Sequence, residues 1–417
     1  MIRLTNWAGN VTFSTDTLYQ PESLAELRAL VAGNDRVRVL GTGHSFNRIA
    51  DCAADGVLVS VDRLPRAVHI DQAAASVTVP AGLRYGELTA ALAPNGLALA
   101  NLGSLPHISV AGACATGTHG SGDGNRVLAD AVLGFTLLTG DGSLVRLDRA
   151  DPDFAGAVIG LGSLGVVTEL TLRLVEDYQI YQYVYDDLPL DVLARRFDAI
   201  LGAGYSVSLF TRWQDGRVDQ VWLKSTVARP VEEPFFGAIP AGAARHPVTG
   251  GDPRFTTEQG GVPGPWHQRL PHFRLEFTPS SGAELQSEYF VGRQHAVAAI
   301  EVVRAMARLL DPVLQIGEIR TVAADDLWLS PSYRTDRVAL HFTWIADQAR
   351  VEPVLDELEA RLAGLDAVPH WGKLFSIEPA RLRVLHPRLA DFAALVRRYD
   401  PSGKFANDWT RKYLLGG

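Results

Sequence analysis

The stretch Val37-Arg-Val-Leu-Gly-Thr-Gly-His-Ser-Phe-Asn47 joins a short apolar strand to a glycine turn. Gly41 and Gly43 allow the backbone to turn sharply and to approach a ligand closely. Consecutive backbone N–H groups in such a turn form an anion-binding concavity. His44 follows at the tip. The stretch predicts a phosphate cradle that also presents an imidazole, although an ordinary tight turn with a surface histidine has the same pattern.

Two more glycine-rich stretches lie in the same half of the chain. Residues 101–124 are rich in Gly, Ser, Thr and Ala, and residues 160–165 form a glycine turn before a strongly β-type run. A flexible linker is the alternative for residues 101–124, but the apolar Ile108, Val110 and Cys114 disfavour a solvated coil. Three such loops predict an extended anionic ligand, such as a dinucleotide, held mostly by backbone.

The usual nicotinamide-binding fingerprint is absent from the first strand and turn. Its pattern, Gly-x-Gly-x-x-Gly, requires glycine where this chain has Phe46. A nicotinamide enzyme of the common type is therefore disfavoured.

Length and composition limit the classes of protein that remain possible. A chain of 417 residues predicts two domains. The net charge of -8, without a Lys/Arg block, argues against nucleic acid or an anionic membrane as the partner. Cys52 and Cys114 have neither metal nor redox spacing, which permits a reducing compartment. No metal site is expected. Residues 1–7 lack a signal-peptide pattern and no apolar run of about 20 residues occurs, so we expect a cytoplasmic protein. No obvious association helix is present, so we expect a monomer.

Hydrophobic periodicity predicts a mixed α+β chain. Residues 229–270 are dense in Pro and Gly and predict a long ordered loop that contains some short elements. A β-rich middle domain flanked by the glycine-loop domain is the expected arrangement. The helices are expected at residues 21–31, 85–92, 154–160, 192–201, 295–310, 352–362 and 389–399, and the main strands at 37–40, 57–61, 67–79, 131–147, 166–174, 206–213, 220–226, 287–292, 313–321 and 338–345.

The motifs together resemble a known family, the vanillyl-alcohol-oxidase-type flavoproteins. They are most similar to its sugar-acid and polyol branch of aldonolactone oxidases and alditol (xylitol) oxidases, and within it to the alditol oxidases. The resemblance covers nearly the whole chain and rests on Gly41-Thr-Gly-His-Ser45, Gly103-Ser-Leu-Pro-His-Ile-Ser-Val-Ala-Gly112, Ala115-Thr-Gly-Thr-His-Gly120, Gly162-Ser-Leu-Gly-Val-Val167, His370-Trp-Gly-Lys373, Asn6-Trp-Ala-Gly-Asn10 and Glu318-Ile-Arg320.

The resemblance implies a two-domain α+β flavoprotein. Residues 1–180 and 375–417 would form the FAD-binding domain, made of two α/β subdomains, and residues 181–374 a cap with an antiparallel sheet over the flavin. It implies FAD attached covalently through His44 to the flavin 8α-methyl group. The implied cofactor-binding residues are Gly41, Thr42, Gly43, His44, Ser45, Gly103, Ser104, Ser109, Gly112, Thr116, Gly117, Thr118, His119 and Val167.

Strand geometry suggests where substrate would bind. Glu318 and Arg320 are two residues apart on one predicted strand and so share a face, as do His341 and Thr343 on the next. With Lys373 they suit a polyhydroxylated neutral substrate. Without the resemblance, a structural Glu–Arg pair with a surface lysine is the better interpretation.

The resemblance assigns roles to these side chains. Glu318 would accept from a substrate hydroxyl, and Arg320 and Lys373 would stabilise the developing alkoxide. Ser104 and Thr343 would bind further hydroxyls. Lys373 is our hypothesis for the base that takes the hydroxyl proton, while His341 is either a substrate ligand or a satisfied core residue.

The leading functional hypothesis is oxidation of the primary C1 hydroxyl of a linear polyol, such as xylitol or sorbitol, to the aldose. Hydride would pass to flavin N5, and O2 would be reduced to H2O2. A small residue at Gly103 favours an oxidase over a dehydrogenase, unless it only allows the loop to turn. Two alternatives are an aldonolactone oxidase or dehydrogenase of the same fold, and a flavin-carrying binding or electron-transfer module.

Overall fold

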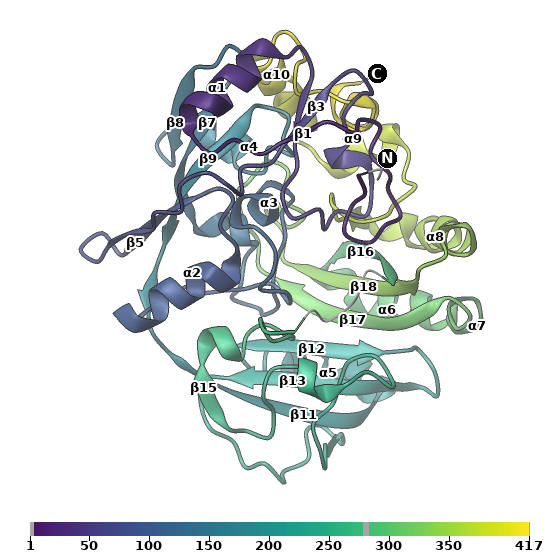
Figure 1. Cartoon of the computed structure of the whole chain (residues 1–417). Helices are drawn as coiled ribbons and strands as arrows, with labels where there is room; N and C mark the ends of the chain where they lie inside the picture. The colour runs from purple at the N-terminus through teal and green to yellow at the C-terminus, as the bar shows by residue number, and fades with distance from the viewer. Residues whose placement is uncertain (1–3, 278–282, 417) are drawn as a thin grey trace.

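The computed structural model describes residues 4–277 and 283–416. Its largest sheet is antiparallel and comes from the middle of the chain, where the sequence predicts a β-rich domain. Figure 1 shows this sheet in the lower half of the molecule, beneath the N-terminal elements. In spatial order its strands are β14 (Ile239–Pro240), β11 (Gln179–Pro189), β13 (Arg217–Ser225), β12 (Ser206–Thr211), β17 (Leu314–Val322), β18 (Arg337–Ile345), β16 (Glu284–Gly292) and β19 (Val368–Pro369), with β15 (Pro263–Pro265) paired to β11.

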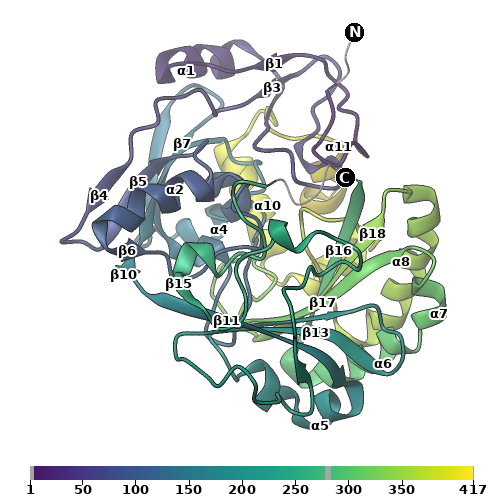
Figure 2. The same ribbon diagram turned by 60° about the horizontal axis from the view of Figure 1, so that its bottom comes forward.

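The two faces of this sheet differ because side chains alternate along each strand. Leu209, Ile319 and Leu340 point to one face, where they are buried in a hydrophobic cluster. Glu318 and His341 point to the other face. The helices that cover the apolar face, visible in Figure 2 beneath and beside the sheet, are α5 (Leu190–Leu201), α6 (Ala296–Arg304), α7 (Ala307–Leu310) and α8 (Gln348–Leu362). The polar face is left for the interior between the two halves of the molecule.

The N-terminal part contains three smaller sheets. A parallel sheet joins β1 (Leu18–Tyr19), β3 (Val57–Val59) and β2 (Val37–Val39). An antiparallel sheet has the order β4 (His69–Asp71), β5 (Ser76–Pro80), β9 (Val166–Arg173), β7 (Val132–Leu138) and β8 (Leu144–Asp148), and β6 (Leu97–Ala98) pairs with β10 (Val175–Glu176). The helices beside them are α1 (Leu24–Gly33), α2 (Tyr85–Leu92) and α4 (Phe154–Ala157).

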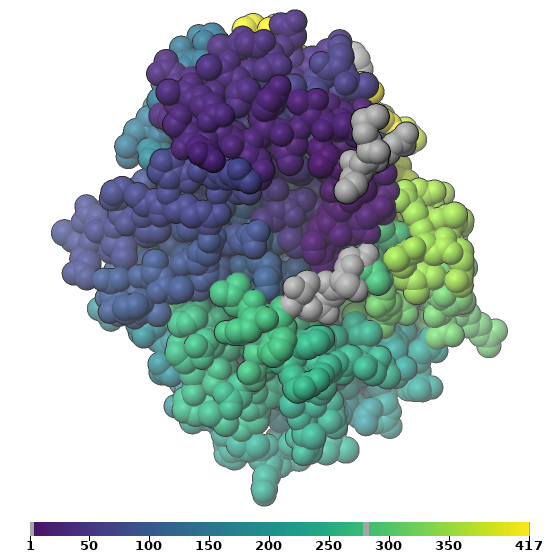
Figure 3. All heavy atoms as spheres, in the orientation of Figure 1, coloured from purple at the N-terminus to yellow at the C-terminus, as the bar shows by residue number. Residues whose placement is uncertain are grey.

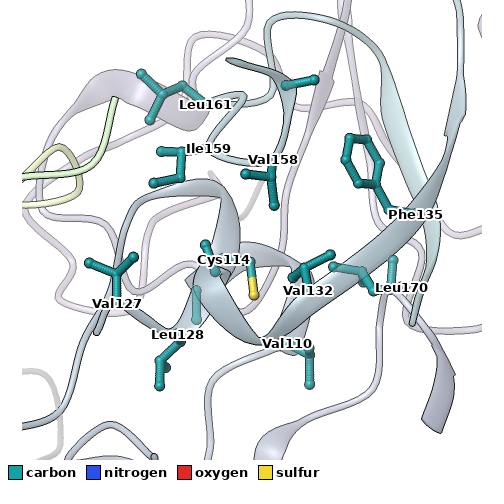
Figure 4. Packing of buried hydrophobic residues seen from close by; sticks show 14 of the residues in the cluster. Val110, Cys114, Val127, Leu128, Val132, Phe135, Val158, Ile159, Leu161 and Leu170 are labelled. Carbon is teal, nitrogen blue, oxygen red and sulfur yellow. The ribbon is translucent and has the colours of Figure 1, made fainter. Parts of the chain in front are cut away.

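A short buried helix lies at the centre of this part. Helix α3 (Val110–Ala115) occupies the Gly/Ser/Ala-rich stretch, for which the sequence predicted no helix. Figure 4 shows Val110 and Cys114 on it, among Leu128, Val132 and Leu170. Six residues are too few to display helical periodicity, and small side chains allow close packing on all sides. Cys114 is therefore a buried core residue, as its lack of metal or redox spacing predicted.

The C-terminal segment returns to the N-terminal part. Helices α9 (Pro379–Leu385), α10 (Leu389–Tyr399) and α11 (Asp408–Thr410) contribute side chains to the same hydrophobic cluster as α1 and α3. The buried guanidinium of Arg38 links the segments directly. It donates to the carbonyl oxygens of Gly162 (2.9 Å) and Phe405 (2.6 Å), which are far apart in sequence. We propose residues 1–180 with 375–417 as one domain and residues 181–374 as the cap.

Most of the helices and strands predicted from the sequence are present, and some helical segments differ from the prediction. The helix expected at 295–310 is divided into α6 and α7 at residues 305–306, and α9 was not expected. The 229–270 segment is an ordered loop with the short strands β14 and β15, as expected. Among the described residues, no helix is both long and apolar enough to cross a lipid bilayer. Figure 3 shows purple and blue N-terminal atoms above, and teal and green atoms of the middle of the chain below.

Candidate functional site

A cavity of about 760 Å³ lies between the glycine-rich loops and the polar face of the large sheet. Its walls come from both halves of the molecule, from Arg38 near the N-terminus to Lys373 near the end of the middle segment. A volume in this range is typical of small-molecule and cofactor sites. The residues expected from the sequence that line it are Gly41, Thr42, Gly43, His44, Ser45, Ser104, Ser109, Gly112, Thr116, Thr118, His119, Val167, Glu318, Arg320, His341, Thr343 and Lys373.

The turn after β2 presents His44 to this cavity. Gly43 adopts a left-handed conformation (φ +72°), which explains why glycine is needed there. The Trp7 ring stacks on the His44 imidazole at 4.9 Å between centroids and an interplanar angle of 20°. Burial lowers the pKa of His44 to about 4, so the imidazole is neutral near pH 7. Its Nδ1 atom is buried and has no hydrogen-bond partner among residues 4–277 and 283–416.

Two asparagines hold the His44 turn against neighbouring segments. Asn6 donates to the carbonyl oxygen of Ser45 at 2.9 Å, which gives the N-terminal Asn-Trp-Ala-Gly-Asn run a structural role. Asn47 donates to the carbonyl oxygens of Trp371 and Lys373, both at 2.8 Å. The His44 turn and Lys373 are thereby held in fixed relative positions, although more than 300 residues separate them.

The second glycine-rich loop leaves its backbone close to its neighbours. A Cβ atom on Gly112 would lie 2.7 Å from the Ser109 hydroxyl oxygen, and one on Gly41 would lie 3.0 Å from the same atom. Two expected cofactor-binding residues, however, do not line the cavity. Gly117 follows the end of α3 with a left-handed conformation (φ +67°). The nearest atoms to a Cβ on Gly103 would be the His119 carbonyl oxygen, Leu128 Cδ1 and Thr118 Cγ2, each at the ordinary contact distance of 3.8 Å. A cofactor contact of either glycine stays a prediction.

The polar face of the large sheet carries a row of ionisable side chains. The strand registers pair Glu318 of β17 with His341 of β18, and His341 with Glu288 of β16. Paired residues point to the same face, so the three side chains lie side by side. Arg320 and Thr343, each two residues along, extend the row on this face. Strand pairing therefore brings together the residues that the sequence analysis chose on two separate strands.

Glu288 is the centre of the charge network. This fully buried carboxylate accepts from Arg320 Nη2 at 2.5 Å and from Lys373 Nζ at 2.7 Å. His119 Nε2 lies 3.3 Å away. Burial alone would raise the pKa of Glu288, but the two cations hold it well below its ordinary value. Among the side chains that line this part of the cavity, Glu288 and Glu318 balance Arg320 and Lys373 while Lys373 is protonated. Lys224 does not line the cavity and faces His272 and two carbonyl oxygens.

Both ring nitrogens of His341 have a hydrogen-bond partner. Its Nδ1 lies 3.1 Å from Lys373 Nζ, and its Nε2 lies 3.3 Å from the Thr343 hydroxyl. Burial holds its pKa well below the ordinary value, and Lys373 lowers it further. Burial also lowers the pKa of Lys373, and Glu288 opposes that shift.

Three buried residues of this network were not predicted from the sequence: Glu288, His272 and Lys224. His272 Nε2 lies 2.9 Å from Glu318 Oε1, and Lys224 Nζ lies 3.2 Å from His272 Nδ1. Glu288 had one usable signal, a charged residue in a predicted strand beside apolar neighbours. His272 lies close to the Pro/Gly-rich segment, where no periodicity shows which way a side chain points.

The cavity fits FAD. Glycine-rich backbone lines one side, which suits the diphosphate of a dinucleotide. The unpartnered, neutral nitrogen of His44 borders the same space. The residues that would hold the cofactor come from the turn after β2, the loop that contains α3, and the turn before β9.

Comparison with protein families gives two matches on different parts of the chain. Residues 15–148 match the model of an FAD binding domain. Residues 283–413 match the model of D-arabinono-1,4-lactone oxidase. The first match covers the glycine-rich stretches at residues 41–47 and 101–124, and the second covers Glu288, Glu318, His341 and Lys373.

Characterised relatives match over almost the full length. An alditol oxidase from a Streptomyces species is 50% identical over 414 residues, which cover 99% of both chains. An L-gulono-1,4-lactone dehydrogenase from Mycobacterium tuberculosis is 28% identical, over 98% of both chains. The L-gulonolactone oxidase of Mus musculus is 24% identical, over 99% of this chain and 98% of the relative.

Solved structures show the same fold at low identity. A solvent-stable cholesterol oxidase superimposes with a TM-score of 0.77 at 16% identity, over 99% of this chain and 97% of the other. The cholesterol oxidase of B. sterolicum gives a TM-score of 0.76 at 15% identity, over 99% and 96%. Together with the 50% identical relative, these matches show that the chain is an FAD-dependent oxidoreductase and belongs to the vanillyl-alcohol-oxidase-type family, in the branch of the sugar-lactone oxidases.

Proposed function

We propose that this enzyme oxidises the primary C1 hydroxyl of a linear polyol, such as xylitol or sorbitol, to the aldose. The observation that carries the proposal is the balanced set of Glu288, Glu318, Arg320 and Lys373 beside the cofactor cavity. Equal numbers of buried charges favour a neutral substrate with many hydroxyls, because a charged substrate would leave one charge unpaired. The relative named alditol oxidase supports the same substrate class.

When bound, FAD supplies a two-electron acceptor that takes hydride at N5 and passes the electrons to O2 with formation of H2O2. The protein's contribution is positional and electrostatic. Glu318 accepts a hydrogen bond from a substrate hydroxyl, while Arg320 and Lys373 stabilise negative charge on the reacting oxygen. Ser104 and Thr343 offer hydroxyls at the cavity wall for the rest of the polyol chain.

We propose Lys373 as the base that takes the hydroxyl proton. Two of its neighbours are acceptors, Glu288 Oε2 and His341 Nδ1, and burial lowers its pKa. His341 is the weaker candidate because both of its nitrogens already have partners. Lys373→Ala should lose turnover and keep its flavin. Lys404→Ala removes another buried lysine, remote from the cavity, as a matched control. A near-normal rate in Lys373→Ala would remove this role.

We also propose that His44 carries the flavin covalently. The purified protein would be precipitated with acid and run on a denaturing gel to detect flavin fluorescence. Colour that stays with the polypeptide in the wild type, and is released in His44→Ala, supports the linkage. Colour released from the wild type contradicts it.

The substrate assay compares xylitol with a γ-lactone by production of peroxide. Turnover of xylitol alone supports the proposal. Turnover of the lactone alone favours the aldonolactone alternative, to which the matched D-arabinono-1,4-lactone oxidase model also points. Anaerobic reduction of the flavin by xylitol would exclude a pure binding or electron-transfer module. The cytoplasmic location and the monomeric state remain part of the proposal.

A further inference from the structure

Lys224 is an ionisable residue that the proposed chemistry does not use. It lies on β13 and is 1% exposed. Its ammonium group has three acceptors, the carbonyl oxygens of Leu270 and Pro271 and the Nδ1 atom of His272. Three acceptors match the three protons of the charged form. A buried lysine needs such partners because burial without them is strongly unfavourable.

His272 is held in place from several directions. Its backbone N–H donates to the carbonyl oxygen of Ser104 at 3.1 Å, which fastens it to the loop beside the cavity. The rings of Phe210 and Trp222 meet its imidazole edge-on, at 5.3 and 5.4 Å between centroids. These contacts hold the imidazole ring in one orientation, in which Nδ1 faces Lys224 and Nε2 faces Glu318.

The chemistry of the two partners determines which nitrogen carries the proton. Burial lowers the pKa of His272 to about 4, and Lys224 acts in the same direction, so the ring is neutral near pH 7. Burial lowers the pKa of Lys224 to about 7, so its ammonium form prevails below that pH. An ammonium group only donates, and an ionised carboxylate only accepts. The Nδ1 atom must therefore accept from Lys224, and the Nε2 proton must donate to Glu318 Oε1.

We propose that Lys224, acting through His272, is a positioning residue for Glu318. It fixes the imidazole tautomer, and the tautomer fixes one carboxylate oxygen of Glu318. The other oxygen, Oε2, then remains on the side of Arg320, whose Nε lies 3.6 Å away, and is the one available to a substrate hydroxyl. This inference rests on the proposed polyol function only for the role of Glu318, since the tautomer itself does not depend on any substrate.

The same arrangement occurs a second time in the site. Lys373 Nζ lies beside Nδ1 of His341, whose Nε2 faces the Thr343 hydroxyl. In both cases a protonated lysine makes Nδ1 the acceptor and directs Nε2–H toward a residue of the substrate wall; for Lys373 this is the state after it has taken up a proton. The repetition fixes donor and acceptor directions at two points of the polar sheet face.

The direct test is the tautomer of His272 in the full-length holoenzyme. Protein labelled with ¹⁵N in the histidine rings would be studied by NMR, with the His272 signals identified by their loss in His272→Phe. We expect a protonated Nε2 and a bare Nδ1 in the wild type, and a mixture or the opposite tautomer in Lys224→Met. The opposite tautomer in the wild type, or no change in Lys224→Met, would overturn the proposal. The assignment requires that His272→Phe folds, which its flavin content and melting temperature check; if it does not fold, loss of the signals in His272→Gln supplies the assignment.

Kinetics supply the second test. Lys224→Met should lower kcat/KM for xylitol by roughly ten- to a hundred-fold, mainly through KM, because the affected hydrogen bonds involve a charged group. Flavin content should not change. In the His272→Phe background the same substitution should cost almost nothing, because Lys224 acts through that ring. Losses that multiply in the double variant would contradict the proposal.

The matched control is Lys404→Met. Lys404 is also buried and also donates to a carbonyl oxygen, that of Val31 at 2.6 Å, but it does not line the cavity. Its loss should affect the melting temperature without changing KM or the His272 signals. If the wild type shows the expected tautomer and does not oxidise xylitol, the proposed function fails and the tautomer assignment remains.

Discussion

At the scale of single residues, Glu288 is the side chain on which the charge balance of the site depends. Replacing it with glutamine keeps its size but removes the charge shared by Arg320 and Lys373. Breaking a buried ion pair typically costs about 3–5 kcal/mol of stability. We also expect kcat/KM for the polyol to fall about a hundred-fold, since a small displacement of positioning groups has effects of that size. Thermal unfolding and steady-state kinetics on Glu288→Gln measure both.

The pH profile of Glu288→Gln gives a separate test of Lys373. Glu288 opposes the effect of burial on Lys373, so its removal should lower the pKa of Lys373 further. A base that must be neutral then stays active at lower pH, and the acidic limb of kcat/KM should move down. Glu359→Gln is the matched control, because Glu359 is bonded to Tyr289 and Ser376 away from the cavity. An acidic limb that does not move would argue against Lys373 as the base.

At the scale of elements, the turn between β5 and α2 is packed so closely against the neighbouring backbone that only glycine fits at position 82. A Cβ on Gly82 would lie 2.5 Å from the Val61 carbonyl oxygen and 2.8 Å from Asp62 Cα, both backbone atoms at the cavity wall. Gly82→Ala should therefore cost about 1–3 kcal/mol through overpacking. We expect a lower melting temperature and weaker flavin retention, measured on the same preparation.

Gly33→Ala is the comparison for that substitution. Gly33 ends α1, and nothing lies within 4 Å of a Cβ placed there. Alanine favours helix over glycine by up to about 1 kcal/mol, so this variant should be as stable as the wild type or more stable. Equal stability of the two alanine variants would show that the Gly82 turn can relax.

Helices and strands with a clear hydrophobic periodicity could be predicted from the sequence, and those without such a periodicity could not. The strands that carry Glu318 and His341 alternate regularly, so the face of each residue could be read from the sequence. Their register could not, because it depends on pairing between segments far apart along the chain. The short helix α3 and the side-chain direction of His272 had no periodic signal. Gly103 and Gly117, which the resemblance places at the cofactor, do not line the cavity, and their contact with the cofactor stays a prediction.

At the scale of the whole molecule, the family motifs located the cofactor half more completely than the substrate half. Backbone loops leave a local signature of small residues, as at Gly41 and Gly112. The charge network around Glu288 joins side chains from β16, β17 and residue 373, and only the folded sheet brings them together. Lys224 was harder to predict than these residues, because it contacts Glu318 only through His272, which lies in a different segment of the chain.

The molecule as a whole should lose stability in mild acid because it buries neutral histidines. Burial lowers the pKa of His44 and His272 to about 4 and that of His386 to about 3, and it lowers those of His119, His341 and His370. The unfolded chain, with histidine pKa values near 6.5, then binds more protons than the folded chain. Stability is therefore present above pH 6.5 and is lost as the pH falls toward 4, by about 1.4 kcal/mol per pH unit for each histidine involved.

Calorimetric melting between pH 4 and 8, with proton uptake taken from buffers of different ionisation enthalpy, measures this slope. Asp325 and Glu359 oppose it, because burial raises the pKa of Asp325 to about 6 and that of Glu359 above its ordinary value, but these are two groups against the six histidines named. His386→Gln removes a histidine that stacks on Trp371 and should reduce the proton uptake on unfolding near pH 5 by about one. A melting temperature that does not change from pH 7 to pH 5 would mean that the buried imidazoles are charged in the folded state.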